Sequence, residues 1–153
     1  MRTFEGTFNN SVDDKGRVAI PARHRGLLKE LGQKQVMVTY HFVDPNPCLD
    51  LYTMPEWEKL GDRLDQMTGS FGEARTYFES VYIGQAQSCQ LDGQGRILIP
   101  QSLRTRAKLA EEVTFVGSRN KIRIFRSEAY EDIVEAYQDM MRQNRNALGD
   151  LGI

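Results

Sequence analysis

Short stretches of alternating apolar and polar residues, separated by glycine and proline, run through this chain and predict a β-rich fold. Val18 and Ile20 alternate with their neighbours as the residues of a half-buried strand do. That strand begins at Arg17, and a first strand runs to about Val12. The four residues between them carry a turn in which Gly16 is free to adopt a positive φ. This segment therefore predicts a β-hairpin.

Helical spacing of apolar residues predicts four amphipathic helices, two of them short and two longer. Pro21 and Pro100 each end a strand and can open a short helix at its first turn. Thr53–Glu56 forms a capping-box pattern that begins a longer helix, and a second longer helix follows Ser127. The predicted apolar faces are Leu27, Leu28 and Leu31; Leu103, Ala107 and Ala110; Trp57, Leu60, Leu64 and Met67; and Tyr130, Ile133, Val134, Tyr137 and Met141.

The middle and the end of the chain break these patterns. Thr68–Gly72 is interpreted as a break, and a helix from about Glu73 to Val81 follows it. Its predicted apolar side consists of Ala74, Tyr77, Phe78 and Val81. The tail from Asn144 onward is expected to fray.

One motif occurs twice, 79 residues apart. The segments 13–21 and 92–100 both read Asp-x-x-Gly-Arg, then three apolar residues, then proline, and Arg25 and Arg104 follow the two prolines at the same distance. Further apolar segments match in the same order: 36–38 with 113–115, 49–52 with 122–125, and 56–60 with 129–133. A series of matches in order indicates an internal duplication.

We therefore expect an α+β, β-rich chain made of two repeats in the order hairpin, short helix, two strands and longer helix. The predicted limits are residues 1–67 for the first repeat, 68–82 for a linker helix, 83–142 for the second repeat, and 143–153 for a C-terminal tail.

The two Asp-x-x-Gly-Arg turns are the sharpest candidates for a functional site, although a structural interpretation is open. Such turns are common in hairpins, and Asp13 can simply accept hydrogen bonds from the turn backbone or form a surface ion pair. In the functional interpretation Asp13 pairs with Arg17 and aims its guanidinium, and Asp92 does the same for Arg96. Two aimed guanidiniums suit phosphates or guanine edges in a major groove.

Further polar residues extend this candidate DNA-binding surface. Lys15, Arg23, His24 and Arg25 add positive charge in the first repeat, and Gln94 occupies the position of Lys15 in the second. Arg104, Arg106 and Lys108 are placed similarly. Arg23 and Arg25 fit a merely solvated helix face equally well.

Composition narrows the class of protein without deciding it. The chain of 153 residues is 40% hydrophobic and 27% charged, which is ordinary for a globular protein. Its net charge of −1 gives no overall attraction to nucleic acid, so binding would depend on a local patch. We expect no secretory signal, no membrane span and a cytoplasmic location. Cys48 and Cys89 are expected to be buried or half-buried free thiols, because their spacing fits no metal site.

Enzyme chemistry finds little support in the sequence. There is no phosphate-binding Gly-x-x-x-x-Gly-Lys loop, no Gly-x-Ser-x-Gly elbow, and no nucleophile placed beside His24 or His41. We expect no catalytic residues, no cofactor and no metal. Trp57 and Tyr130 are expected to pack in the core rather than stack on bases.

The duplicated motif resembles the MraZ family over about residues 4–141. Other matching features are Phe4 and Gly6, Pro47–Tyr52 with Pro55–Trp57, and Val116–Gly117 with Asn120–Lys121. By this resemblance Asp13, Arg17, Asp92 and Arg96 match the paired Asp-x-x-x-Arg positions of the family. Lys15 matches the basic turn residue, whereas the second turn carries Gln94 there, which implies either a weaker DNA contact or a role in assembly.

The resemblance implies an AbrB-like swapped-hairpin fold, in which two hairpin units of one chain interleave into a small barrel with flanking helices. It also implies a ring-like homo-oligomer, associated with the nucleoid, that binds double-stranded DNA. Its implied targets are short promoter repeats upstream of the division and cell-wall gene cluster, including its own promoter. The implied role is transcriptional regulation, usually repression.

Two other functions remain open. One is a protein-interaction module, either antitoxin-like or an assembly scaffold, without specific DNA binding. The other is a small hydrolase or ligand binder, which needs a polar pocket that the sequence does not indicate.

Overall fold

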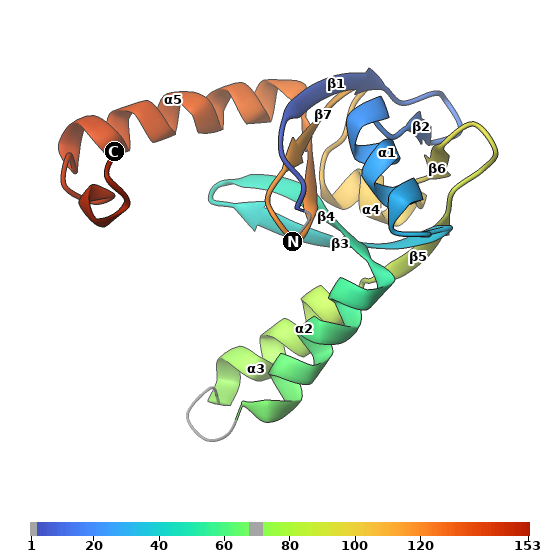
Figure 1. Ribbon diagram of the computed structural model, residues 1–153, viewed down its shortest axis with the longest axis horizontal. Coiled ribbons are helices and arrows are strands. Elements are labelled where there is room, and N and C mark those ends of the chain that lie inside the picture. The colour runs from blue at the N-terminus through green and yellow to red at the C-terminus, as the bar shows by residue number, and fades with distance from the viewer. Residues whose placement is uncertain (1–2, 68–71) are drawn as a thin grey trace.

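The elements of the chain follow the order expected for two similar units, as the computed structural model shows for residues 3–67 and 72–153 (Figure 1). The first half contains β1 (Thr7–Ser11), β2 (Arg17–Ala19), α1 (Ala22–Glu30), β3 (Gln35–Val43), β4 (Asn46–Thr53) and α2 (Met54–Gln66). The second half contains β5 (Gln87–Gln90), β6 (Arg96–Leu98), α4 (Gln101–Arg106), β7 (Glu112–Gly117), β8 (Ile122–Arg126) and α5 (Ser127–Gln143). Between the halves lie α3 (Gly72–Phe78) and a π-helical turn, η1 (Glu79–Ile83), and the tail contains a 3-10 turn, η2 (Gly149–Leu151).

The strands of the two halves pair with one another rather than forming two separate sheets. A six-stranded antiparallel sheet has the order β1-β7-β8-β4-β3-β5, and β2 pairs with β6 in a separate two-stranded ribbon. Thus β1 pairs with β7 of the second half, and β5 with β3 of the first half. The predicted limits of the two repeats, 1–67 and 83–142, stay a prediction.

Two expectations about the strands are corrected by this topology. The backbones of the predicted first hairpin's arms, β1 and β2, meet at the bridge between Val12 and Val18 and at the bond from the Asp13 amide to the Arg17 carbonyl, and the Asn10 side chain donates to the Ala19 carbonyl. Beyond that point each arm pairs with the other half. The expected small barrel does not close in the described part of the chain, because the edge strands β1 and β5 pair on one side only and the ribbon stays separate.

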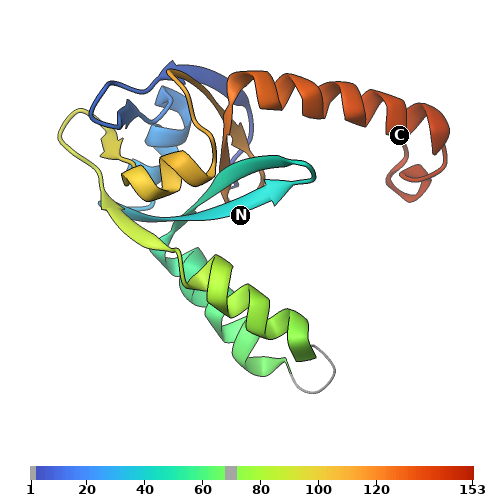
Figure 2. The same cartoon turned by 180° about the vertical axis from the view of Figure 1, so that it is seen from behind.

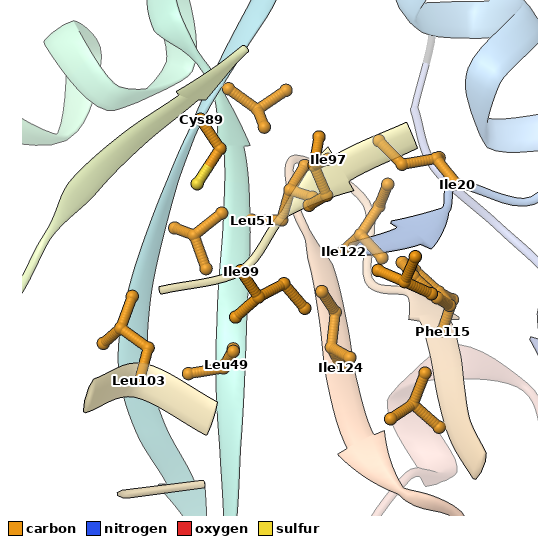
Figure 3. Packing of buried hydrophobic residues seen from close by; sticks show 14 of the residues in the cluster. Ile20, Leu49, Leu51, Cys89, Ile97, Ile99, Leu103, Phe115, Ile122 and Ile124 are labelled. Atoms are coloured by element: carbon orange, nitrogen blue, oxygen red, sulfur yellow. The ribbon is translucent and has the colours of Figure 1, made fainter. Parts of the chain in front are cut away.

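The hydrophobic core lies between the sheet and the ribbon with its short helices (Figure 3). Ile20, Ile97 and Ile99 from the ribbon segments pack over Leu51 and Phe115 of the sheet. Each such fully buried side chain contributes roughly 1.5–3 kcal/mol. The core thus holds the ribbon firmly against the sheet.

The short helix α4 ends at Arg106, before Ala110, the last residue of its predicted apolar face. Leu103 and Ala107 are buried as expected, but Ala110 lies exposed beyond the helix, and Leu109 packs against the core in its place. The reason is the backbone of Lys108, whose φ of 55° ends the helical path and shifts the following residues in phase. In α1, Leu28 is buried as expected, whereas Leu31, which follows the end of the helix, is exposed.

Two helical arms extend from the body, one formed by α2 with α3 and the other by α5 (Figures 1 and 2). The N-cap half of the expected capping box is confirmed, because the Thr53 hydroxyl accepts from the Glu56 amide at 3.3 Å. Neither α2 nor α5 has a fully buried residue, so their predicted apolar faces are only half covered. The predicted helix 73–81 begins at Gly72 and turns into η1 at Glu79, while 68–71 of the predicted break lie outside the described residues.

A polar cluster on the other side of the sheet fixes η1 in place. Asp50 of β4 is fully buried directly opposite Arg123 of β8. It accepts from the Arg123 Nε at 3.1 Å and from the Tyr82 hydroxyl at 2.6 Å. The Tyr52 and Tyr82 hydroxyls lie 2.6 Å apart, and the Thr39 hydroxyl donates to the Tyr82 carbonyl at 2.5 Å. Asp50 therefore joins both halves of the sheet to the segment that connects them.

Candidate nucleic-acid interface

The first Asp-x-x-Gly-Arg turn is organised around the carboxylate of Asp13. Its Oδ1 accepts from the backbone amides of Lys15 and Arg17, both at 2.9 Å, and its Oδ2 accepts from the Arg17 Nε at 2.9 Å. Gly16 adopts a φ of 92°, which closes the turn by a bond from its amide to the Asp13 carbonyl. The expected pairing of Asp13 with Arg17 is therefore present, and it orients the guanidinium.

The second turn repeats this arrangement atom for atom. Asp92 Oδ1 accepts from the amides of Gln94 at 2.8 Å and Arg96 at 2.9 Å, and Oδ2 accepts from the Arg96 Nε at 2.9 Å. Of the two glycines in this turn, only Gly95 takes a positive φ. Gly93 occupies the place of Asp14, where the turn needs no left-handed residue.

The hydrogen bonds to both turn carboxylates favour their ionised form. The amide of Arg17 is the largest influence that holds the pKa of the Asp13 carboxyl below its usual range, and the amide of Arg96 has the same effect on the pKa of Asp92. The two carboxylates therefore remain charged and keep orienting their arginines at neutral pH.

The register of the ribbon places both arginines on one face. Arg17 lies opposite Leu98, and Ala19 lies opposite Arg96. Opposite residues of an antiparallel pair share a face, and alternate residues of a strand do so as well. Val18 and Ile97, which form the middle pair, point into the core.

We call the outward face of Arg17, Ala19, Arg96 and Leu98, together with the turn residues Lys15 and Gln94, the ribbon face. The two arginines are diagonal neighbours, a relation that places residues roughly 7–8 Å apart. The ribbon and its turns lie on the side of the body away from α5 (Figures 1 and 2).

Arg25 and Arg104 have a structural role that sequence reasoning missed. The Arg25 Nη1 donates to the Ile20 carbonyl at 3.3 Å, and a Cβ on Gly95 of the opposite turn would overlap the Arg25 side chain. The second half mirrors this contact, since the Arg104 Nε donates to the Ile99 carbonyl at 3.0 Å and the guanidinium packs on Gly16. The sequence did carry one sign of this role, since both repeats have the same arginine and the same turn glycine at matching positions.

The other predicted site residues are only partly brought together. Lys15 and Gln94 are exposed in the turns. Arg23 is also exposed, but it lies next to the N-terminal segment, with a surface hollow shared by Thr3 and Glu5. His24 adds no surface charge, because it is buried, its Nε2 lies 3.0 Å from the Glu5 carbonyl oxygen, and burial lowers its pKa.

The ribbon face carries little net charge. Arg17 and Arg96 are each balanced by an aspartate, and Asp14 offsets Lys15. Any attraction between this face and an anion thus depends on directed hydrogen bonds more than on a diffuse positive field. Over the described residues there is no group of three or more potential metal ligands among His, Cys, Asp and Glu, and no helix is both long and apolar enough for a membrane span.

Comparison with known proteins gives one consistent result. Residues 3–78 and 82–150 match a family described as "MraZ protein, putative antitoxin-like". A protein of Yersinia enterocolitica named "Transcriptional regulator MraZ" is 35% identical over 98% of this chain and 99% of its own length. A protein of the same name from Nitrosococcus oceani is 38% identical over 84% of each chain.

Among solved structures, a Pyrococcus horikoshii protein studied in solution matches 79% of this chain and 97% of its own. The TM-score is 0.36 and the sequence identity is 16%. This likeness is too low to bear on the fold.

Proposed function

This chain belongs to the MraZ family, and from that premise we propose that it is a sequence-specific DNA-binding regulator of transcription that reads DNA through its ribbon face. The relatives carry names of regulators rather than of enzymes, which supports a binding function without catalysis.

The observation that carries the proposal is the pair of aimed arginines. Arg17 and Arg96 stand on one outward face of a two-stranded ribbon, and each is oriented by its own aspartate. A major groove admits a two-stranded β-ribbon, and an arginine there can form two hydrogen bonds to the O6 and N7 atoms of guanine. The core-anchored ribbon supplies the rigid base that such a contact needs.

Lys15 supports this role from the first turn, where it reaches a phosphate or a second guanine. Arg25 acts indirectly, because its contacts with Ile20 and the opposite glycine hold the ribbon in register. Arg23 contributes a phosphate contact at the periphery of the face.

We further propose the finer role that the family resemblance implies. The protein represses the division and cell-wall gene cluster by binding short promoter repeats, including those of its own promoter, in the cytoplasm at the nucleoid. The exchange of strands between the halves also supports the swapped-hairpin relationship, since each arm of a hairpin motif pairs with the other repeat.

A ring-like homo-oligomer fits the low charge of the ribbon face. Many weak contacts on repeated sites act together through effective concentration, so no single face needs high affinity. The exposed apolar surface supports such an assembly. Tyr137 and Met140 are exposed on α5, and a hollow of about 260 Å³ is lined by Tyr40, His41, Phe42, Tyr77, Phe78, Val81 and Tyr82.

The test is a binding titration against DNA from upstream of the gene for this protein, with scrambled DNA as control, at two salt concentrations. Specific, salt-sensitive binding is expected. Arg17→Ala should weaken specific binding by roughly 5- to 150-fold per site, the equivalent of about 1–3 kcal/mol. Arg17→Lys keeps the charge but not the forked donor geometry and should recover only the nonspecific part.

Lys59→Ala is the matched control, since Lys59 lies exposed on α2 away from the ribbon. Operator binding by folded Arg17→Ala equal to that of the control would refute the proposed role of the ribbon face.

A protein-interaction module is the second candidate, and the antitoxin-like description of the family favours it. Equal, weak binding to native and scrambled DNA would support this candidate in place of the regulator.

A further inference from the structure

The two ends of the ribbon face are built alike in the backbone but differ in their side chains. At one end, Arg17 is flanked by Leu98 on the opposite strand and by the Lys15 turn. At the other end, Arg96 is flanked by Ala19 and by the Gln94 turn. Because the backbone hydrogen bonds of the two turns match, the side chains that differ occupy equivalent positions at the two ends of the ribbon face.

Leu98 stands out on this face because it is 55% exposed. It is the one large apolar side chain so exposed on the ribbon within the described residues. The core does not need it, since its neighbours Ile97 and Ile99 are the residues that point inward. Its register partner is Arg17, so its side chain stands beside the aimed guanidinium.

We propose that Leu98 reads the C5-methyl group of a thymine adjacent to the guanine contacted by Arg17, so that the protein recognises a site with two unlike halves. This inference rests on the proposed function. Opposite side chains in an antiparallel pair begin about 4.5–5.5 Å apart, and successive bases of one strand are spaced about 3.4 Å, so Arg17 and Leu98 can reach neighbouring base pairs.

The bases follow from the chemistry of the side chains. In a major groove only thymine presents a methyl group, and apolar side chains contact it. Ala19, the counterpart of Leu98, ends at its Cβ and therefore reaches less far from the strand at the Arg96 end. There Gln94 offers an amide, which pairs with adenine, in place of the cationic Lys15. A symmetric face would read a palindrome, whereas this one reads guanine with thymine at one end and guanine with adenine at the other.

The test uses duplex DNA from upstream of the gene in which single thymines are replaced by uracil, which removes only the methyl group. When uracil replaces one particular thymine in each site, the affinity of wild-type protein should fall about 3- to 5-fold, the effect expected for the loss of about one methyl contact. Leu98→Ala should bind native DNA more weakly and show no loss at that thymine.

Ala19→Leu is the complementary variant, because it places the same side chain at the equivalent position of the other end. It should create sensitivity to a methyl group at that end. Both positions lie on the outward face, so both variants should remain folded, and circular dichroism checks this.

The outcomes distinguish failure of the proposed DNA-binding function from failure of the proposed role of Leu98. If wild-type protein does not distinguish native from scrambled DNA, the proposed function fails. If it binds specifically but no uracil substitution distinguishes wild type from Leu98→Ala, the reading by Leu98 is wrong while the function stands. A fall in assembled mass on Leu98→Ala, without any difference between thymine and uracil, would also overturn the inference and assign Leu98 to a subunit contact.

Discussion

Replacing Asp50 with alanine removes the acceptor of two hydrogen bonds that join three separate parts of the chain. Asp50 lies in β4, and its partners are Arg123 in β8 and Tyr82 in η1. Both bonds have a charged acceptor and are stronger than neutral ones. Because the carboxylate is fully buried, its removal leaves both donors without this acceptor in a place that bulk solvent reaches poorly.

The expected loss follows from what the partners can do afterward. Removing one member of a buried ion pair costs about 3–5 kcal/mol. Arg123 is 26% exposed and can partly regain water, and the Tyr82 hydroxyl can still pair with Tyr52. We therefore expect about 3 kcal/mol for Asp50→Ala. Asp50→Asn keeps the shape and an acceptor but loses the charge, so we expect about 1–2 kcal/mol.

Urea unfolding at fixed protein concentration measures these values. The Asp50→Ala midpoint should fall by roughly 1–3 M, given the slopes usual for small proteins. Asp139→Ala on α5 is the control, because Asp139 forms an exposed ion pair with Arg142 and should cost no more than about 0.5 kcal/mol. If Asp50→Ala were as stable as this control, the polar cluster would not hold η1 to the sheet and our reasoning would be refuted.

Three further predictions concern the turns and the thiols. Gly95→Ala should destabilise the protein by about 1–3 kcal/mol in thermal unfolding, because φ is 75° and the new methyl overlaps Arg25, whereas Gly93→Ala should be nearly neutral; equal effects would contradict the packing. Folding lowers the pKa of both turn aspartates, so their contribution to stability is present above the ordinary value of 3.8 and is lost as pH falls through the lower folded pKa. The double variant Asp13→Asn/Asp92→Asn should lose this part of the dependence of stability on acid pH. An unchanged pH profile of stability would contradict the role of the two carboxylates. Burial raises the pKa of Cys48 to about 12 and that of Cys89 to about 11, so a thiol reagent at neutral pH should modify both only after unfolding, and rapid modification of the native protein would disprove their burial.

The sequence was sufficient to predict features that depend on neighbouring residues. The pairing of Asp13 with Arg17, the N-cap at Thr53 and the order of elements all follow from local spacing, and the structure confirms them. Cys48 and Cys89 are free and buried, which agrees with the expectation drawn from a spacing that fits no metal site.

Features that depend on distant pairing were not predictable in the same way. Nothing local to Arg25 indicates that it packs on Gly95, because the contact exists only once β2 pairs with β6. Asp50 alternates with apolar residues in β4, so the sequence pattern predicts a solvent-exposed side chain. In the structure η1 covers Asp50 and buries it. The prediction for Ala110 failed because Lys108 adopts a positive φ. A lysine rarely adopts such a φ, so the sequence gives no sign of it.

The pairing of β1 with β7 has a consequence for how the protein is made. Asn9 and Thr114 face each other in this pair although 105 residues separate them in the chain. Translation proceeds at about 5–20 residues per second, so the first strand emerges from the ribosome roughly 5–20 seconds before its partner. Contacts this remote also make folding slow, and during the delay an unpaired strand edge is open to association with other nascent chains. Completion of the second half, rather than formation of the first turn, therefore sets the moment at which this protein can fold.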